Sequence, residues 1–567
     1  MEEFYNEFNG ETYISFRDTI VIKDKYQSIY SKVKRNIFYF LSKEKRIFVK
    51  NFNHISNLVD ASNEIYIINT LSKNKSLLDN ITGFALDYNQ RLVVVKEEDH
   101  TLVIAGAGSG KTLTIIGKIR YLIEKKFFDE SEILCISFTN EATNKLKESL
   151  KNTYNYNINV CTFHKLALSI LRDNGLEPSI AQPDTLEYII DEFFDYLILD
   201  NALLLRILKT YFNDPYEKVK GTKKFVKFKK LIAQFIHLYK ANIYGEEQFY
   251  HFLMIEKNKK NHLLLICIIT IYNLYKAELI SQNEIDFDDM IVEATMSLKE
   301  FGIKKKYRYI VIDEYQDSSF VRCNLIKELV RLSSAKLLAV GDDFQSIYRF
   351  TGCNLDIFIN FKDYFINPDI IHINHTYRNA QELIDLAGNF IMRNKYQIKK
   401  QLKSDKHVDK PIKIVFYEEK KQDFKKLVNL ILATSKLLIL ARNNNDIYQF
   451  IDDSFEMQND TLYYNEQSIK YLTVHKSKGL EEENVILINL ENSMTGFPNK
   501  MEDDEILKHI IKSRNDIPFE EERRLFYVAL TRTKNNSYLF VPKANYSIFV
   551  KEIMCDFPEK IEFISIK

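Results

Sequence analysis

The most informative stretch of the chain is TLVIAGAGSGKTLTIIGKI, residues 101–119. A run of apolar residues leads into three glycines and a Lys-Thr pair, after which apolar residues recur at helical spacing. Small residues between a strand and a helix let successive backbone N–H groups converge on phosphate oxygens, and the helix N-terminus adds partial positive charge. The stretch therefore predicts a phosphate-binding loop between a strand and a helix.

The loop matches the pattern G-x-x-x-x-G-K-[ST], except that Ala105 stands at the first glycine position. Lys111 is predicted to reach the β- and γ-phosphates, and the Thr112 hydroxyl to ligate Mg²⁺. The alternative is a glycine-rich turn that binds nothing. The predicted nucleotide-binding loop residues are Ala105, Gly106, Ala107, Gly108, Ser109, Gly110, Lys111 and Thr112.

A second strand-like run, YIVIDEYQD at 309–317, ends in adjacent carboxylates. Asp313 is predicted to hold Mg²⁺, and Glu314 to polarise a water molecule in line with the γ-phosphate. Adjacent acids after a strand can equally be solvated loop residues. Their combination with the phosphate loop favours the catalytic interpretation.

Composition sets limits on the partners of the chain. The 79 Lys and Arg residues nearly balance 78 Asp and Glu residues, so a nucleic acid would have to be bound by local patches. The six cysteines form no CxxC pair, and this favours a reducing cytoplasm over a zinc site or disulfides. No apolar run reaches the roughly 18 residues of a membrane span, and the first residues lack a signal-peptide pattern. We expect a soluble cytoplasmic protein without membrane partners.

The order of strand-like and helix-like runs predicts an α/β fold with two parallel-sheet domains. Residues 86–174 and 285–359 form the predicted first domain, with a helical insertion at 175–284. Residues 360–567 form the predicted second domain. Residues 1–85 are an N-terminal extension, predicted to be mostly helical after a short β-prone start, and its role stays open. The strand-like runs of the second domain are DIIHIN, PIKIVFY, KLLILAR, IKYLTV, NVILINL and NSYLFV.

Nine motifs occur here in the order typical of superfamily 1A helicases of the UvrD/Rep class, which the chain resembles over residues 86–545. Within that class, the leader and the TFHKLAL stretch look most like helicase IV-type proteins. The resemblance implies two RecA-like domains. The motifs are LDYNQ, AGAGSGKT, SFTNEA, CTFHKLAL, IDEYQD, GDDFQSIYRF, TYRN, TVHKSKGLE and EEERRLFYVALTRT.

The resemblance implies further nucleotide contacts. Gln90 resembles the glutamine that reads adenine, and Tyr377 the tyrosine that stacks on the base. Gln345 resembles the γ-phosphate sensor, and Glu481 the ribose contact.

Two arginines resemble the fingers that the second domain donates across the cleft, Arg378 and Arg532. Such fingers contribute roughly 10³- to 10⁵-fold to NTPase rates. The alternative for either is a surface salt bridge, which contributes about 0 to 1 kcal/mol.

The resemblance also implies a track for single-stranded DNA. Tyr348 and Phe350 fall where the family places aromatic rings against bases, and stacking contributes about 1 to 3 kcal/mol per base. Phe138 can instead be a core residue, and His164 and His475 can be structural. The other residues predicted to grip the strand are Phe138, Thr139, Asn140, Thr162, His164, Thr473 and His475.

The sequence departs from the family in the turn after Tyr348. The family usually has Trp where Phe350 stands, so the stacking surface is smaller here. The usual RGA is TGC at 351–353, which puts a charged contact from that turn in doubt.

A lysine-rich segment, KVKGTKKFVKFKK at 218–230, lies in the predicted helical insertion. Seven lysines alternate there with Phe225 and Phe228. The segment is either a solvated helix face or a contact with duplex phosphates.

The combined interpretation is an ATP- and Mg²⁺-dependent DNA helicase and translocase that moves 3′ to 5′ on single strands, in repair, recombination or replication. Its expected substrates are single-stranded DNA and single-strand/duplex junctions. One alternative is a helicase subunit of an anti-phage or recombination complex with a partner nuclease. Another is a DNA-stimulated ATPase that strips proteins, such as RNA polymerase, from DNA.

The region between LLILARNN and YLTVHKSKG is short. Large relatives insert a regulatory subdomain there, whereas here only residues 445–470 intervene. Chains below about 40 residues rarely fold alone. This stretch is predicted to supply a helix (DIYQFIDDSF) and a strand (TLYYNE) to the second domain. Without the subdomain we expect activity as a monomer.

Overall fold

The computed structural model describes residues 2–5, 12–16, 19–22, 46–49, 56–198, 201–242, 245–366, 368–501, 503–511 and 518–566. The chain divides into two compact units. The first unit comprises Met1–Glu97 and Thr112–Phe127, and the second comprises Glu98–Lys111 and Phe128–Lys567. The boundary passes through one helix, α5 (Lys111–Glu124).

The first unit combines a small sheet with helices. Strands β1 to β3 pair antiparallel, and β3 pairs parallel with β4. Three of its helices are α2 (Ser56–Lys73), α3 (Lys75–Leu78) and α4 (Tyr88–Val95). The strands are β1 (Glu2–Tyr5), β2 (Thr12–Phe16), β3 (Thr19–Ile22) and β4 (Arg46–Val49). The predicted β-prone start and later helices are present, while YSKVKRNIFYFLSKEK lies outside the described residues.

The second unit contains a six-stranded sheet whose described pairings are all parallel, in the order β12-β5-β11-β10-β6-β7. Its central strands are apolar and buried, as a parallel sheet covered on both faces requires. The strands are β5 (His100–Ala105), β6 (Ile133–Ser137), β7 (Asn159–Thr162), β10 (Tyr309–Ile312), β11 (Lys336–Gly341) and β12 (Asp369–Ile373). Associated helices are α6 (Asn140–Tyr154), α7 (Phe163–Asp173), α14 (Phe287–Phe301), α15 (Phe320–Ser333), α16 (Asp356–Ile359) and α17 (Phe361–Tyr364).

One strand prediction is wrong in its sheet. The sequence predicts the DIIHIN run in the second α/β domain, but β12 pairs with β5 at the edge of the first sheet. Its mixed apolar and polar residues suit an edge position, and only the folded chain shows which edge is free to accept it.

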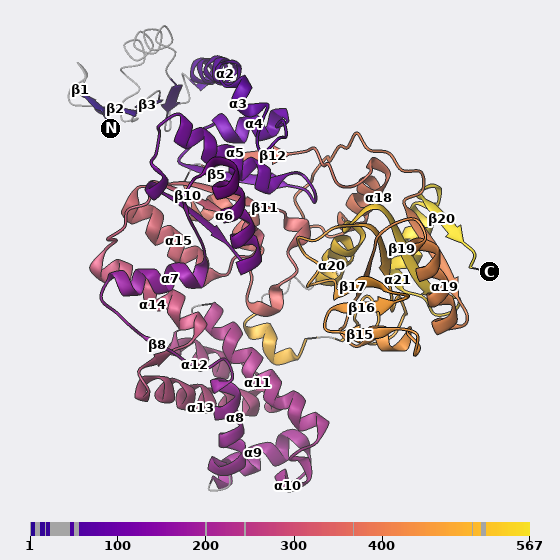
Figure 1. The fold of residues 1–567 in the computed structure, drawn as a ribbon. Coiled ribbons are helices and arrows are strands. Elements are labelled where there is room, and N and C mark those ends of the chain that lie inside the picture. The colour runs from indigo at the N-terminus through magenta and orange to yellow at the C-terminus, as the bar shows by residue number, and fades with distance from the viewer. Residues whose placement is uncertain are drawn as a thin grey trace. The chain divides into compact units, whose positions relative to one another are not determined.

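Helices α8 to α13 form a bundle between α7 and α14 in the sequence, and Figure 1 shows them gathered together. A short parallel pair, β8 (Ser179–Ile180) and β9 (Glu284–Ile285), joins the segments that lead into and out of the bundle. The helices are α8 (Thr185–Glu192), α9 (Ala202–Phe212), α10 (Tyr216–Val219), α11 (Lys223–Ala241), α12 (Glu246–Ile255) and α13 (Lys259–Ser281).

Helix α13 alone, among the described helices, is long and apolar enough to cross a membrane. Leu265, Cys267, Ile268 and Ile271 of this helix are fully buried in the core of the bundle. Packing within the bundle accounts for this apolar composition.

The other sheet of the second unit has eight strands in the order β15-β16-β17-β14-β18-β19-β13-β20 (orange and yellow in Figure 1). From β17 to β20 in this order, every neighbouring pair of strands is parallel. The pairs β15–β16 and β16–β17 at the other end are antiparallel. The strands are β13 (Ile412–Tyr417), β14 (Leu437–Ala441), β15 (Glu456–Gln458), β16 (Thr461–Tyr464), β17 (Gln467–Thr473), β18 (Glu482–Leu487), β19 (Thr533–Pro542) and β20 (Ile561–Ile564). The helices are α18 (Gln381–Ile391), α19 (Lys420–Leu432), α20 (Glu520–Leu530) and α21 (Ile548–Asp556).

The predicted α/β class, with two sheets rich in parallel strands, is confirmed. In the segment 445–470, the predicted strand is β16, but the predicted helix is only a 3₁₀ turn, Asp446–Gln449. A β-hairpin of β15 and β16 fills the rest and extends the eight-stranded sheet.

Candidate functional site

The candidate site lies where neighbouring strands of the six-stranded sheet end. Lys111 follows the loop after β5, Glu314 follows β10, and Gln345 follows β11. Strands β5, β11 and β10 are adjacent and parallel, so their carboxyl ends share one edge. Ligands of open parallel sheets bind at that edge.

The phosphate loop depends on glycine for its backbone shape. Gly108 and Gly110 adopt positive φ values of 70° and 75°, a region in which residues with a Cβ are strained. A Cβ on Gly108 would also lie 2.4 Å from the Cβ of Arg378. The Tyr377 N–H donates to the Gly108 carbonyl at 3.0 Å, and the Thr376 hydroxyl donates to the Ala107 carbonyl at 2.7 Å. The loop and the TYRN segment are therefore in direct contact.

Lys111 and Glu314 form an ion pair at 3.1 Å. Burial alone would raise the pKa of Glu314, but the charges of Lys111 and Lys478 outweigh it and hold that pKa at about 2. Burial, followed by the charge of Glu314, raises the pKa of neighbouring Asp313 to about 6. Without nucleotide, Glu314 thus neutralises the lysine that is predicted to bind phosphate. A γ-phosphate that drew Lys111 away would make Glu314 a stronger base.

Lys478 is a site residue that the sequence interpretation missed. Its side chain is 8% exposed and donates to Asp317 Oδ2 at 2.5 Å and to the Gln345 carbonyl at 2.8 Å. Burial by itself would lower the pKa of Lys478. The carboxylates of Asp317 and Glu314 outweigh burial, so the pKa of Lys478 is raised. Lys478 lies inside the TVHKSKGLE motif and Asp317 inside the IDEYQD motif. Their places in these motifs were the sequence signal that could have identified both as site residues.

Gln345 and Arg532 are joined directly. Arg532 Nη2 donates to Gln345 Oε1 at 3.1 Å, and Gln345 Nε2 donates to Asp342 Oδ2 at 2.5 Å. Arg532 is 1% exposed, and its other hydrogen bonds run to oxygens of Val528, Leu480 and Thr531. Among the described residues no carboxylate pairs with it, and burial, followed by the charge of Arg378, lowers its pKa to about 9. A buried cation in this state favours an anionic ligand.

Lys400 is a second residue that the sequence interpretation missed, and it binds the loop that carries Gln345, the predicted γ-phosphate sensor. Its side chain is 2% exposed and forms ion pairs with Asp342 and Asp343, which are fully buried. Its ammonium also lies 4.0 Å from the ring centre of Phe344. Because Asp342 in turn accepts from Gln345, Lys400 fixes the orientation of the predicted sensor.

Arg378, the other predicted finger, pairs with Glu481 at 2.6 Å. Glu481 also pairs with Lys534 at 3.1 Å. Tyr377 is 52% exposed, with its ring 4.6 Å from that of His375. The structure thus brings Tyr377, Arg378 and Glu481 together beside the phosphate loop.

Gln90 and Thr112 belong to the first unit. The Gln90 side chain is fully buried and accepts from the Asp87 N–H at 2.9 Å, in a capping box that begins α4. In the same unit, Lys118 of α5 donates to the Val94 carbonyl at 2.9 Å near the end of α4. Their predicted roles toward adenine and Mg²⁺ stay predictions.

The predicted DNA residues of the first sheet lie at the ends of β6 and β7. Thr139 and Thr162 are helix N-caps whose hydroxyls accept from Ala142 N at 3.1 Å and Lys165 N at 3.4 Å. Asn140, the first residue of α6, is exposed. Capping thus uses one lone pair of each threonine hydroxyl and leaves the hydroxyl proton for another acceptor.

Phe138 and His164 are partly buried beside this edge. The Phe138 ring packs edge-on against Phe163 at 5.3 Å and lies under the Arg322 guanidinium at 5.2 Å. His164 packs edge-on against the exposed ring of Phe287, and burial, followed by Arg322, lowers its pKa. His164 therefore offers a neutral ring at pH 7.

Tyr348, Phe350 and His475 form one aromatic cluster. The Tyr348 hydroxyl donates to the His475 carbonyl at 3.0 Å, and the Phe350 and His475 rings lie 5.5 Å apart. Phe350 is 49% exposed, and burial lowers the pKa of His475 to about 4, helped by Arg442. Thr473, buried just before the cluster, accepts from Lys476 N at 3.4 Å. The exposed face of Phe350 is free of the core and can stack on a base.

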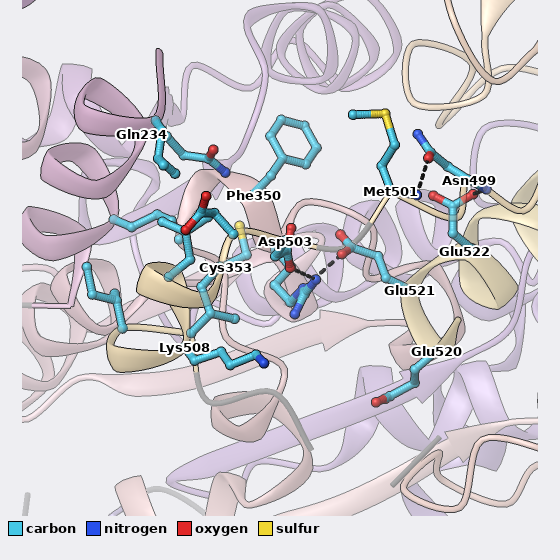
Figure 2. A pocket seen from close by; sticks show the side chains of 18 of the residues that line it. Gln234, Phe350, Cys353, Asn499, Met501, Asp503, Lys508, Glu520, Glu521 and Glu522 are labelled. Carbon is cyan, nitrogen blue, oxygen red and sulfur yellow. Dashed lines mark hydrogen bonds and ion pairs between the residues drawn. The ribbon is translucent and has the colours of Figure 1, made fainter. Parts of the chain in front are cut away.

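Phe350 projects into a pocket of about 1630 Å³ (Figure 2). His475 and Thr473 also line this pocket. Lys224, Lys227 and Lys230 of α11 line the same pocket. Phe225 and Phe228 of that helix are almost fully buried in the core of the bundle, and Phe228 also borders the pocket. The lysine-rich segment therefore contributes three charges and the edge of one buried ring to the pocket lining.

Lys111→Ala is expected to lower ATP turnover by about 10²- to 10³-fold, because one fixed charge on the transferred phosphate is lost. Affinity for single-stranded DNA should stay close to that of the wild type, since Lys111 contacts none of the predicted DNA residues. Steady-state ATPase assays and fluorescence anisotropy with a labelled oligonucleotide measure the two quantities. Undiminished turnover would contradict the role of the loop.

Two family models match the chain. The UvrD/REP helicase N-terminal domain covers residues 86–366, and the UvrD-like helicase C-terminal domain covers residues 454–544. Similar proteins include DNA helicase IV of Escherichia coli, 24% identical over 86% of this chain and 73% of that protein. A probable DNA helicase II homolog of Mycoplasma capricolum is 31% identical over 57% of this chain and 43% of its own. ATP-dependent DNA helicase Rep of Buchnera aphidicola is 28% identical over 65% of this chain and 52% of its own.

The match thus spans most of helicase IV but only about half the length of the other two relatives. The two family models follow each other in the order of the motifs, and each covers most strands of one sheet of the second unit. The chain belongs to the UvrD/Rep family of superfamily 1 helicase enzymes.

Proposed function

We propose that this chain is an ATP- and Mg²⁺-dependent DNA helicase that translocates 3′ to 5′ along single-stranded DNA. The observation that carries the proposal is the contact between Gln345 and Arg532. It joins the end of β11 in one sheet to the residue that precedes β19 in the other. Binding and hydrolysis of ATP at such a junction can change how the two α/β parts hold a strand. The names of the relatives, DNA helicase IV and ATP-dependent DNA helicase Rep, support the substrates.

In this proposal Lys111, Arg378 and Arg532 stabilise charge on the transferred phosphate, while Gln345 senses the γ-phosphate and Glu314 orients the attacking water. ATP would release Lys111 from Glu314 and Arg378 from Glu481, since both pairs are made without nucleotide.

The donors suit Mg²⁺. Asp313 supplies a hard carboxylate oxygen, and the described residues contain no group of three or more His, Cys, Asp or Glu that could hold a metal alone. Mg²⁺ commonly binds through one or two protein oxygens, with phosphates and water completing its shell. The bound ion would neutralise phosphate charge. The role of Thr112 rests on its place after Lys111 in the motif.

For the DNA we propose a track along Phe138, Thr139, Asn140, Thr162 and His164, continued by Tyr348, Phe350, Thr473 and His475. Neutral imidazoles, hydroxyls and aromatic faces contact bases and sugars without sequence preference. The basic side chains of α11 contact the backbone or the duplex junction.

We also propose a domain division: an N-terminal extension at 1–85, a first RecA-like domain at 86–174 and 285–359 that also takes β12, a helical insertion at 175–284, and a second RecA-like domain in the remainder of 360–567. A large insertion between β14 and β17 is absent from this arrangement, since only a 3₁₀ turn and the β15–β16 hairpin lie there. Action as a monomer in the cytoplasm follows as part of the proposal.

Strand displacement on duplexes with either a 3′ or a 5′ single-stranded tail tests the function. The 3′-tailed duplex should be unwound with ATP and Mg²⁺, with an initial rate linear in enzyme concentration. Preference for the 5′ tail would overturn the polarity, and a sigmoidal dependence would overturn action as a monomer. ATP hydrolysis and protein displacement without unwinding would favour the protein-stripping alternative. Activity only with a co-purified nuclease would favour the complex.

A further inference from the structure

A short segment of the second α/β region is anchored on the helical bundle. Residues 503–511, here called the strap, contain the 3₁₀ turn Glu505–His509. Ile506, Leu507 and Ile510 of the strap are buried in the hydrophobic core of the bundle. The strap is therefore fixed by apolar packing against the bundle.

Polar contacts reinforce this anchor. His509 Nε2 lies 2.8 Å from Glu256 Oε2, at the C-terminal end of α12. Asn258 and Asn261 each donate to Glu505 Oε2 at 3.5 Å. Together these contacts hold the beginning of the strap at the pocket into which Phe350 projects.

The strap pairs a carboxylate, Asp503, with Arg349, the charged residue between Tyr348 and Phe350. Arg349, between Tyr348 and Phe350, pairs with Asp503 of the strap at 2.6 Å and with Glu521 of α20 at 2.8 Å. Figure 2 shows Asp503 and Glu521 facing each other across this pair of dashed contacts. Both carboxylates line the pocket, and so do Arg349 and Phe350.

We propose that Arg349 binds a backbone phosphate of single-stranded DNA in this pocket, and that Asp503 and Glu521 occupy its guanidinium until a strand arrives. This inference rests on the proposed function. A guanidinium fork accepts a phosphate in the same bidentate geometry as a carboxylate. Arg349 is also the immediate neighbour of the two rings that would stack on bases, so a phosphate of the stacked nucleotides lies within its reach.

The exchange is physically favourable because the ion pairs are partly open to water. The side chains of Arg349, Asp503 and Glu521 are 33%, 44% and 21% exposed, and ion pairs in such positions contribute little to stability. DNA that replaces the carboxylates also releases condensed counterions. The buried anchor keeps Asp503 beside Arg349, so the carboxylates compete with every strand that enters.

The test is a double-mutant cycle in single-stranded DNA affinity, measured by anisotropy with a labelled oligonucleotide at several salt concentrations. Arg349→Gln should weaken binding about 10-fold and make the log–log salt slope shallower by about 0.7. Asp503→Asn combined with Glu521→Gln should tighten binding about 3- to 10-fold. In the Arg349→Gln background, the two acid substitutions should have no further effect, because they act only through Arg349.

A matched control is the pair of Arg331 with Glu328 on α15, in which Arg331 is exposed and Glu328 mostly buried, and neither residue lines the pocket. Arg331→Gln and Glu328→Gln should leave affinity and slope unchanged. If the wild type binds DNA but the acid substitutions tighten binding equally with and without Arg349, the inference is wrong and the effect is general charge. If Arg349→Gln binds as tightly as the wild type, the inference is also wrong. If the wild type binds no single-stranded DNA, the proposed function itself fails.

Discussion

Replacing Arg532 by alanine is expected to lower the DNA-stimulated ATPase rate by about 10³- to 10⁵-fold. Arg532 is buried, contacts the predicted γ-phosphate sensor Gln345 and has no carboxylate partner among the described residues. Its charge is therefore available to the transition state of phosphoryl transfer. Single-turnover hydrolysis with saturating oligonucleotide measures the chemical step directly.

A buried arginine can also matter only for folding, so this prediction needs a matched control. Arg523, on α20 and 6% exposed, pairs with Glu552 at 2.6 Å and contacts none of the predicted ATP-site residues. Arg523→Ala should lower the melting temperature while keeping the chemical rate within a few-fold. Equal rate losses in Arg523→Ala and Arg532→Ala would assign Arg532 a structural role.

Glu314→Gln is expected to slow hydrolysis by about 10²- to 10⁴-fold, the usual contribution of a positioned general base. ATP should bind more tightly, because the amide no longer competes with phosphate for Lys111, whose ammonium lies 3.1 Å from the carboxylate. The variant should remain loaded with ATP and hold single-stranded DNA more strongly. Rapid-quench kinetics, nucleotide-affinity measurements and DNA anisotropy together separate these effects.

The control for Glu314→Gln is the same isosteric change at a carboxylate outside the predicted site, Glu328→Gln. Within the described part of the chain Glu328 forms its ion pair with Arg331 on α15, and its substitution should leave every rate unchanged. Hydrolysis by Glu314→Gln at the wild-type rate would place the general base elsewhere. Slow hydrolysis with weakened ATP binding would instead mean that Glu314 mainly shapes the loop, where it adopts a positive φ of 53°.

The sequence alone predicts which short segments form the candidate site. The phosphate loop, the carboxylates after β10 and the α/β class follow from short segments whose backbone needs are local. Gly108 and Gly110, for example, are required by their own φ values. Lys111 and Glu314 were predicted separately, and the adjacency of parallel strands then brings them together.

Tertiary structure decided what depends on distant partners. The period of DIIHI suits a strand in either sheet, and only the free edge beside β5 places β12 in the first. Lys400 looks like an ordinary surface cation in the sequence, and Lys478 and Arg349 are marked only by their place in a motif. In the folded chain each of the three faces carboxylates from remote segments. A buried charge must be paired, but the presence of a lysine or arginine in the sequence does not show which acid will pair with it. The partner is decided when the sheets and the bundle pack, because packing determines which side chains are removed from water and which acids lie beside them.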